Sequence, residues 1–178
     1  MACIGLMAAG KSTVGRQVAE ELDWRFVDVD TEIEARAGRT VAELADEGGE
    51  AAYRSWERLV VLEALGADDP TVLAAPGGIA LDPDARKAIG GLDVVAVYLR
   101  ADPDTLATRV AEDSEHPRPL VGKDPLTILR GMFRDRDATY RALADIEVQV
   151  DGRTHEEVAA LVLAALLGDP APPPRALP

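Results

Sequence analysis

The chain has 178 residues, of which 47% are hydrophobic, and its formal net charge is −13. This length fits one domain, and no apolar run approaches the roughly 20 residues that a membrane-spanning helix needs. The acidic balance argues against nucleic-acid binding, which requires clustered Lys and Arg against the phosphates. No secretory signal is visible at Met1 and no long apolar patch demands a partner, so we expect a cytoplasmic monomer with no membrane or nucleic-acid partner.

Short β-type runs alternate with helical stretches along the whole chain, which is typical of an α/β fold with a parallel sheet. The predicted strands are residues 2–4, 26–29, 71–75, 94–99 and 146–150. Helix starts are predicted by capping boxes and by Asp-Pro pairs. The boxes are Thr31 with Glu34, Thr40 with Glu43 and Thr154 with Glu157, and the pairs begin at Asp82, Asp102 and Asp124. We expect one domain over residues 1–167 and a proline-rich disordered tail over 168–178.

A glycine-rich loop follows the first predicted strand. It reads Gly5-Leu6-Met7-Ala8-Ala9-Gly10-Lys11-Ser12 and opens an amphipathic helix, which matches the phosphate-loop pattern in its expected setting. Backbone N–H groups and the helix N-terminus can then converge on phosphate oxygens. Lys11 would reach the β- and γ-phosphates of a nucleotide, and the Ser12 hydroxyl would hold Mg²⁺. The loop predicts nucleotide chemistry, and it leaves kinases, GTPases and motor-type ATPases open.

Two carboxylates, Asp28 and Asp30, come at the end of the second predicted strand. Ligands bind at this edge of open α/β sheets, and alternation along an extended chain would point both side chains the same way. One could support the metal, and the other could accept a proton or hydrogen bond from an attacking hydroxyl. Alternatively Asp30 only caps the next helix, although Thr31 already offers a cap. With the short chain length, this pair favours a small-molecule kinase.

Two further segments suit the binding of an acid. Arg54 lies one turn inside a helix that we expect to begin at Gly49, and Arg grips carboxylates in a bidentate way. Taken alone, Arg54 and Glu57 would be an ordinary solvated helix pair. Pro76-Gly77-Gly78 ends the third predicted strand, where missing side chains let backbone N–H groups approach a ligand. Taken alone, this segment would be an ordinary turn.

Residues 111–124 are polar, contain Pro and Gly, and separate two predicted helices. A loop of this length in a compact domain favours a mobile lid over an active site, with a flexible surface loop as the alternative. Arg118 would then neutralise phosphate charge in the transition state. Residues 134–137 are expected to close a helix before Tyr140, and charge-dense helix ends usually face solvent.

Taken in this order, the segments resemble shikimate kinase, a small-molecule P-loop kinase family, from Ile4 to about Leu167. The matching motifs are residues 5–16, Asp28-Val29-Asp30, residues 49–54, residues 76–78, Arg118-Pro119-Leu120, and Arg136 with Tyr140. The resemblance implies a three-layer α/β/α fold with a five-stranded parallel sheet and a lid. It also implies phosphorylation of the 3-hydroxyl of shikimate by ATP with Mg²⁺, giving shikimate 3-phosphate and ADP.

The resemblance also assigns roles to individual residues. Lys11, Asp30 and Arg118 would be catalytic, and Ser12 with Asp28 would hold Mg²⁺. Shikimate would contact Asp30, Arg54, Gly77, Gly78 and Arg136, with the two arginines on its carboxylate. The nucleotide would contact Ala8, Ala9, Gly10, Lys11, Ser12, Thr13, Arg109 and Arg118.

Two positions depart from the family pattern in ways that bear on function, and a third, Tyr53 where the family usually has phenylalanine, is a mild change. Ala8 stands where the phosphate loop usually has glycine, and a methyl group there crowds the turn if φ is positive. Pro76 replaces the first glycine after the third strand and removes an N–H. These changes keep two alternatives open: a related kinase acting on gluconate or another polyol acid, and a nucleotide-binding module without catalysis.

Overall fold

The computed structural model describes residues 1–113 and 124–168. The predicted lid, with Arg118, and the predicted tail lie almost entirely outside these residues. The strands are β1 (Ala2–Ile4), β2 (Arg25–Asp28), β3 (Thr71–Ala74), β4 (Ala96–Arg100) and β5 (Ile146–Gln149). The helices are α1 (Lys11–Leu22), α2 (Val29–Ala37), α3 (Val41–Leu65), η1 (Ile79–Leu81, a 3₁₀ turn), α4 (Pro83–Ile89), α5 (Pro103–Glu112), α6 (Pro125–Leu143) and α7 (His155–Leu167).

The five strands form one sheet in the order β2-β3-β1-β4-β5, and every neighbouring pair is parallel. β1 lies at the centre, with Cys3 beside Ala74 of β3 and Val97 of β4. All three residues of β1 are fully buried, as expected for a central parallel strand. The predicted α/β fold with a five-stranded parallel sheet is confirmed, and because all strands run the same way, their carboxyl ends meet at one edge.

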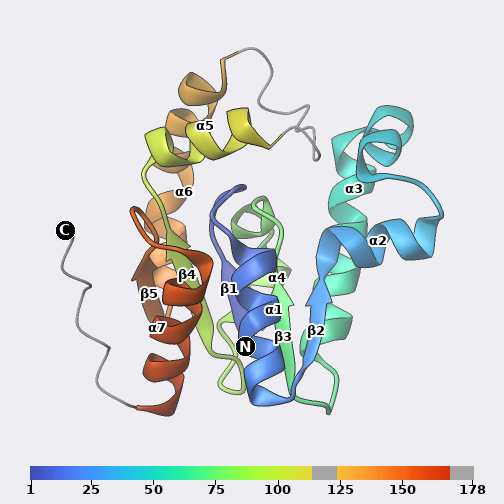
Figure 1. The fold of residues 1–178 in the computed structure, drawn as a ribbon. Helices are drawn as coiled ribbons and strands as arrows, with labels where there is room; N and C mark the ends of the chain where they lie inside the picture. The colour runs from blue at the N-terminus through green and yellow to red at the C-terminus, as the bar shows by residue number, and fades with distance from the viewer. Residues whose placement is uncertain (114–123, 169–178) are drawn as a thin grey trace.

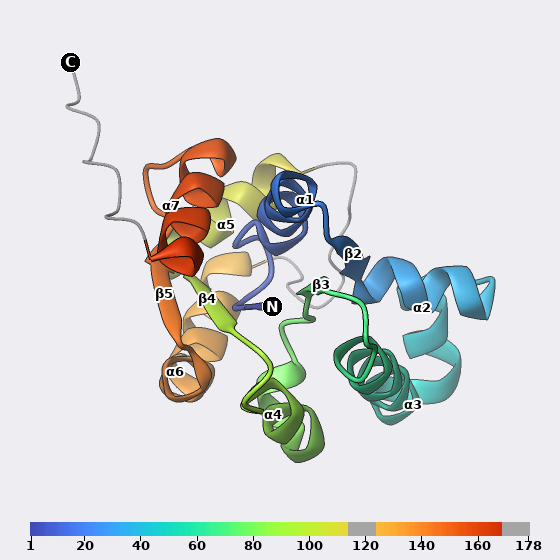
Figure 2. The same cartoon turned by 90° about the horizontal axis from the view of Figure 1, so that it is seen from below.

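Helices cover both faces of the sheet. Figure 2 shows α1 and α7 on one face and α3, α4 and α6 on the other, which gives three layers. Val14 and Val18 of α1 and Val60 and Val61 of α3 are almost completely buried against the sheet. In Figure 1, α2 and the first half of α3 lie beside the β2 edge, and α5 crosses near the carboxyl ends of the strands. These elements surround the sheet edge at which ligands bind in such folds.

Most helix starts follow the predicted capping signals. The boxes at Thr40 and Thr154 are both complete, and the Asp82 and Asp124 side chains accept backbone N–H groups of α4 and α6. Asp102 occupies the same position before α5 without a side-chain cap bond. The long helix α3 bends at Gly49, whose φ of 72° and ψ of 172° are not helical.

The prediction that Thr31 caps the second helix is wrong. β2 passes directly into α2 at Val29, and Asp28 is the capping residue, because its carboxylate accepts the Thr31 N–H at 3.2 Å. The carboxylate stands three residues before Thr31, which is the spacing that a capping side chain requires. Within residues 1–113 and 124–168, no helix combines the length and the apolar content that crossing a membrane demands.

Candidate functional site

A cavity of about 580 Å³ lies at the carboxyl edge of the sheet. Its walls come from the glycine-rich loop, the β2–α2 junction, the chain that leaves β3, the end of α5 and the start of α7. Lys11, Asp28, Asp30 and Gly77 all line this one cavity. The structure therefore brings the predicted phosphate and acceptor segments together in a single space.

The glycine-rich loop has a backbone that opens the N-terminus of α1 toward the cavity. Gly10 caps the helix at φ 92° without a side-chain bond, so the first N–H groups stay available to a ligand. Lys11 Nζ donates to the Leu6 carbonyl at 2.8 Å, which folds the side chain over the loop. Ala8 has a positive φ of 61°, which is the condition under which the sequence analysis expected its methyl group to crowd the turn.

The loop residues differ in how far they reach the cavity. Ala8, Gly10, Lys11, Ser12 and Thr13, which the resemblance assigns to nucleotide binding, line the cavity. Ala9 was also predicted to contact the nucleotide, but the structure does not bring it to the cavity wall. It is 1% exposed, and its N–H donates to the Leu6 carbonyl at 3.4 Å, so its backbone is used inside the loop.

Ser12 and Asp28 meet directly, because Ser12 Oγ donates to Asp28 Oδ2 at 2.5 Å. A hydroxyl and a carboxylate at this spacing offer the hard oxygen ligands that Mg²⁺ prefers, with phosphate and water oxygens completing the shell. Within the described residues, no group of three or more His, Cys, Asp or Glu side chains could hold a metal.

Asp30 lies in the first turn of α2, not on an extended strand, so the alternation argument for its direction was wrong. Its carboxyl group still lines the cavity, and its Oδ1 accepts a hydrogen bond from the Tyr53 hydroxyl at 2.7 Å. The residue as a whole reaches solvent, but protein atoms crowd the carboxyl group. This desolvation raises the pKa of Asp30, and the bond from Tyr53 opposes the rise.

The Arg54 guanidinium lies against the backbone of Gly78. Its Nη1 donates to Glu57 at 2.5 Å and its Nη2 to Glu50 at 3.0 Å. Glu57 is only 2% exposed, so the pair is not the solvated helix pair that its spacing alone suggests. A Cβ atom at Gly78 would lie 1.9 Å from Arg54 Nη1, which explains why no side chain fits there.

Arg136 approaches the same turn from the other side. Arg136 Nη1 and the Tyr140 hydroxyl both donate to the Gly77 carbonyl, at 3.0 and 2.5 Å. Both residues lie inside α6, which continues to Leu143, so the prediction that residues 134–137 close a helix was wrong. Tyr140 is fully buried, because an apolar face extends through this charge-dense sequence. Arg54 and Arg136 thus converge on Gly77 and Gly78, although neither arginine lines the cavity itself.

Arg109 also lines the cavity. Its guanidinium donates to the carbonyls of Ala8, at 3.2 Å, and Val150, at 3.4 Å. These bonds connect α5, the glycine-rich loop and the chain leaving β5. The resemblance assigned Arg109 to nucleotide binding, and the structure places it beside the glycine-rich loop.

The sequence analysis missed the segment between β5 and α7. Arg153, Thr154, His155 and Glu156 all line the cavity. Thr154 was recognised only as a helix cap. A parallel sheet brings the loop after every strand to the same edge, so the position of this loop after the last strand was the signal that could have found it. Arg118 and most of the predicted lid lie outside the described residues.

Known proteins resemble this chain over nearly its whole length. A family model for shikimate kinase matches residues 7–167. The chain is 42% identical to a shikimate kinase of Thermobifida fusca, with 92% of each chain covered. It is 38% identical to that of Zymomonas mobilis, with 92% of this chain and 90% of the other covered. The solved shikimate kinase of Acinetobacter baumannii in complex with shikimate has a TM-score of 0.87 at 30% identity, covering 94% of this chain and 92% of the other.

Proposed function

The chain belongs to the shikimate kinase family, and on this premise we propose that it transfers the γ-phosphoryl group of ATP to the 3-hydroxyl of shikimate. The products are ADP and shikimate 3-phosphate. One observation carries the proposal: Lys11 of the phosphate loop and Asp30 of the acceptor segment line the same cavity. The phosphate donor and the acceptor hydroxyl can therefore bind in the same cavity, next to each other.

On the nucleotide side, the open N-terminus of α1 and Lys11 hold the β- and γ-phosphates, and Arg109 lies next to the loop. Ser12 and Asp28 would hold a Mg²⁺ ion, which would supply positive charge to the phosphate oxygens. The loop with Arg153 and His155 encloses the far end of the cavity. Together these groups keep the γ-phosphorus facing the acceptor side.

On the acceptor side, Arg54 and Arg136 clamp the carboxylate of shikimate beside the Gly77-Gly78 turn. Asp30 accepts a hydrogen bond or proton from the 3-hydroxyl as its oxygen attacks the γ-phosphorus. The new O–P bond forms as the bond to the bridging oxygen of ADP breaks. Most of the rate enhancement then comes from alignment and from positive charge around the transferred group.

A coupled assay of ADP formation tests the proposal with three mixtures: ATP with shikimate, ATP with gluconate, and ATP alone. We expect turnover with shikimate only, and loss of that turnover in Lys11→Met. Preference for gluconate would support the related polyol-acid kinase. A lack of turnover with both acceptors, together with retained ATP binding, would support a nucleotide-binding module without catalysis.

We further propose that the domain over residues 1–167 acts as a cytoplasmic monomer. Light scattering after size exclusion should give a mass near 18.9 kDa, and twice this mass would contradict the proposal.

A further inference from the structure

The Tyr53 hydroxyl binds Asp30, to which we assign acceptor binding, and lies near Glu57, the partner of Arg54. It donates to Asp30 Oδ1 at 2.7 Å, across the interface between α3 and α2. On its own helix, the next residue is Arg54, and the buried Glu57 lies one turn further on. Tyr53 is thus the direct connection between the Asp30 side of the site and the Arg54 side.

The hydroxyl stays a donor under ordinary conditions. Burial raises the pKa of Tyr53 far above its usual value, and the nearby carboxylates of Asp30 and Glu57 raise it further. A protonated phenol has one hydrogen to donate, and the bond at 2.7 Å goes to Asp30, with the Glu57 carboxylate as a second neighbour. The bond occupies Oδ1, so the other carboxylate oxygen, Oδ2, remains the one suited to an acceptor hydroxyl.

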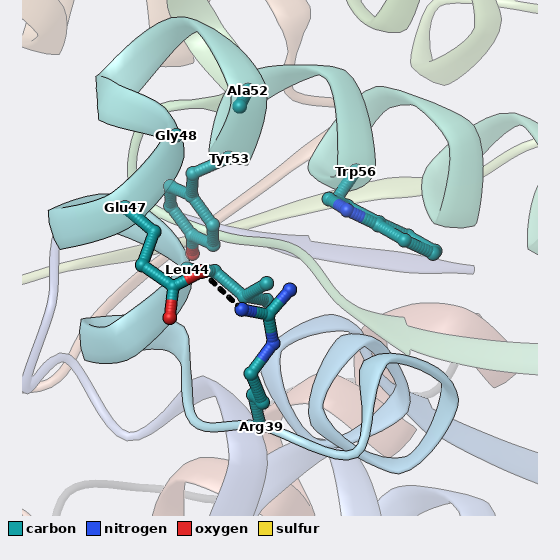
Figure 3. Close-up of a pocket in the computed structure, with 7 residues that line it drawn as sticks. All are labelled: Arg39, Leu44, Glu47, Gly48, Ala52, Tyr53 and Trp56. Atoms are coloured by element: carbon teal, nitrogen blue, oxygen red, sulfur yellow. Dashed lines mark hydrogen bonds and ion pairs between the residues drawn. The ribbon is translucent and has the colours of Figure 1, made fainter.

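The ring of Tyr53 is held by packing that does not involve the hydroxyl. The residue is 8% exposed, and its ring borders a second, smaller cavity of about 240 Å³. Figure 3 shows the ring beside Leu44 and Ala52, with Arg39 and Glu47 paired next to it and Trp56 further along α3. Removal of the hydroxyl alone therefore leaves the ring in place.

Building on the proposed function, we propose that Tyr53 is a positioning residue for the acceptor. Its hydroxyl fixes the orientation of the Asp30 carboxylate and thereby directs Oδ2 to the acceptor hydroxyl. Asp30 stands in the first turn of α2, and the bond from Tyr53 selects one orientation of its carboxylate among the rotamers open to it there. A small misorientation at the reacting oxygen costs rate, because the alignment of the attacking hydroxyl is lost.

Steady-state kinetics of Tyr53→Phe test the proposal. A hydrogen bond to a charged group is worth enough that kcat/KM for shikimate should fall about tenfold. The KM for ATP and the melting temperature should stay close to those of the wild type. Tyr98→Phe is the matched control, since it removes a hydroxyl that donates to Asp137 at 2.9 Å, and it should leave kcat/KM unchanged.

A double-mutant cycle shows whether Tyr53 acts through Asp30. Shikimate affinity is measured by calorimetry for four proteins: the wild type, Tyr53→Phe, Asp30→Asn and the double variant. We expect Tyr53→Phe to lower the affinity much less in the Asp30→Asn background than in the wild type. Equal losses in both backgrounds, or an unchanged kcat/KM in Tyr53→Phe alone, would overturn the positioning role.

The wild-type assay separates this inference from the proposed function. If the wild type phosphorylates shikimate and Tyr53→Phe matches it, only the positioning role fails. If the wild type uses gluconate instead, the proposed function fails, and the same comparison with gluconate still decides the role of Tyr53. If the wild type turns over neither acceptor, both fail.

Discussion

The guanidinium of Arg54 rests directly on the backbone of Gly78, with no space for a side chain between them. The two residues come from α3 and from the turn after β3, so their contact fixes the position of the guanidinium relative to the sheet edge. The lack of a side chain at Gly78 therefore leaves the space that the Arg54 guanidinium occupies. An ordinary turn would not require glycine for this reason.

Gly78→Ala should therefore damage acceptor binding. The added Cβ would lie 1.9 Å from Nη1, and the guanidinium must move away. We expect the KM for shikimate to rise by about tenfold or more, since a displaced arginine loses its charge-assisted bonds to the carboxylate. The KM for ATP should not change.

Gly131→Ala in α6 is the control, because a Cβ atom there meets nothing within 4 Å. This variant should change neither the KM for shikimate nor the KM for ATP.

Arg136→Lys tests the clamp from the opposite side. Lysine keeps the charge but loses the planar fork that grips a carboxylate with two bonds. The bond from Arg136 to the Gly77 carbonyl would be weakened as well. Shikimate affinity should fall by about 2 kcal/mol, measured by calorimetry. If this variant binds shikimate as tightly as the wild type, then Arg136 stabilises the Gly77 turn and does not bind the carboxylate of shikimate.

Ala8 offers a test of stored backbone strain. Its φ of 61° is left-handed, a region that costs a non-glycine residue about 1–2 kcal/mol. Ala8→Gly relieves this cost, in part offset by the extra freedom of glycine in the unfolded chain. We expect a net gain of about 0.5–1 kcal/mol in the free energy of unfolding, measured in urea. Ala9→Gly should lower it instead, because Ala9 is buried and has no left-handed φ.

Much of the fold could be read from the sequence because local patterns determined it. The parallel strands are short apolar runs, and the caps at Thr40 and Thr154 depend on residues three positions apart. The predictions that were wrong concern features that depend on tertiary contacts. Nothing local shows that Glu57 is buried or that α6 continues past its charged segment, since both depend on what packs against those helices.

The same distinction explains the site. The phosphate loop was recognisable because its chemistry lies in consecutive residues. The approach of Tyr53 to Asp30 was not recognisable, since it joins two residues 23 positions apart, on different helices. The cap at Asp28 was mistaken because Thr31 satisfied the same pattern, and only the direct passage of β2 into α2 decides between them.

Cys3 should be inert in the folded protein. It is completely buried in β1, and burial raises the pKa of its thiol to about 12. Since only the thiolate reacts, alkylation by iodoacetamide at pH 8 should occur only as the protein unfolds, and it should accelerate in urea in step with the loss of structure. Fast modification of the native protein at a rate independent of urea would contradict this.

The same shift predicts the dependence of stability on alkaline pH. The folded state holds the Cys3 proton up to about pH 12, whereas the unfolded chain releases it near 9.0. Above pH 9 the unfolded state thus binds fewer protons, and the free energy of unfolding falls by about 1.4 kcal/mol per pH unit for each such group. Cys3→Ala should reduce this slope between pH 9 and 11. The remaining slope comes from buried tyrosines such as Tyr140, whose pKa burial also raises to about 12.

Asp28 performs two tasks that one substitution can separate. Its Oδ1 caps α2 by accepting the Thr31 N–H, and its Oδ2 meets Ser12 at the proposed Mg²⁺ site. Asparagine caps helices as well as aspartate does, so Asp28→Asn should change the unfolding free energy by less than about 0.5 kcal/mol. It removes the negative charge that attracts the metal, and the Mg²⁺ concentration for half-maximal activity should rise about tenfold or more.

Asp28→Ala is the companion variant, because it removes both functions and should lose about 1 kcal/mol of stability as well. An unchanged Mg²⁺ requirement in Asp28→Asn would leave Asp28 with only its capping role, and the metal would then depend on Ser12 and the nucleotide alone.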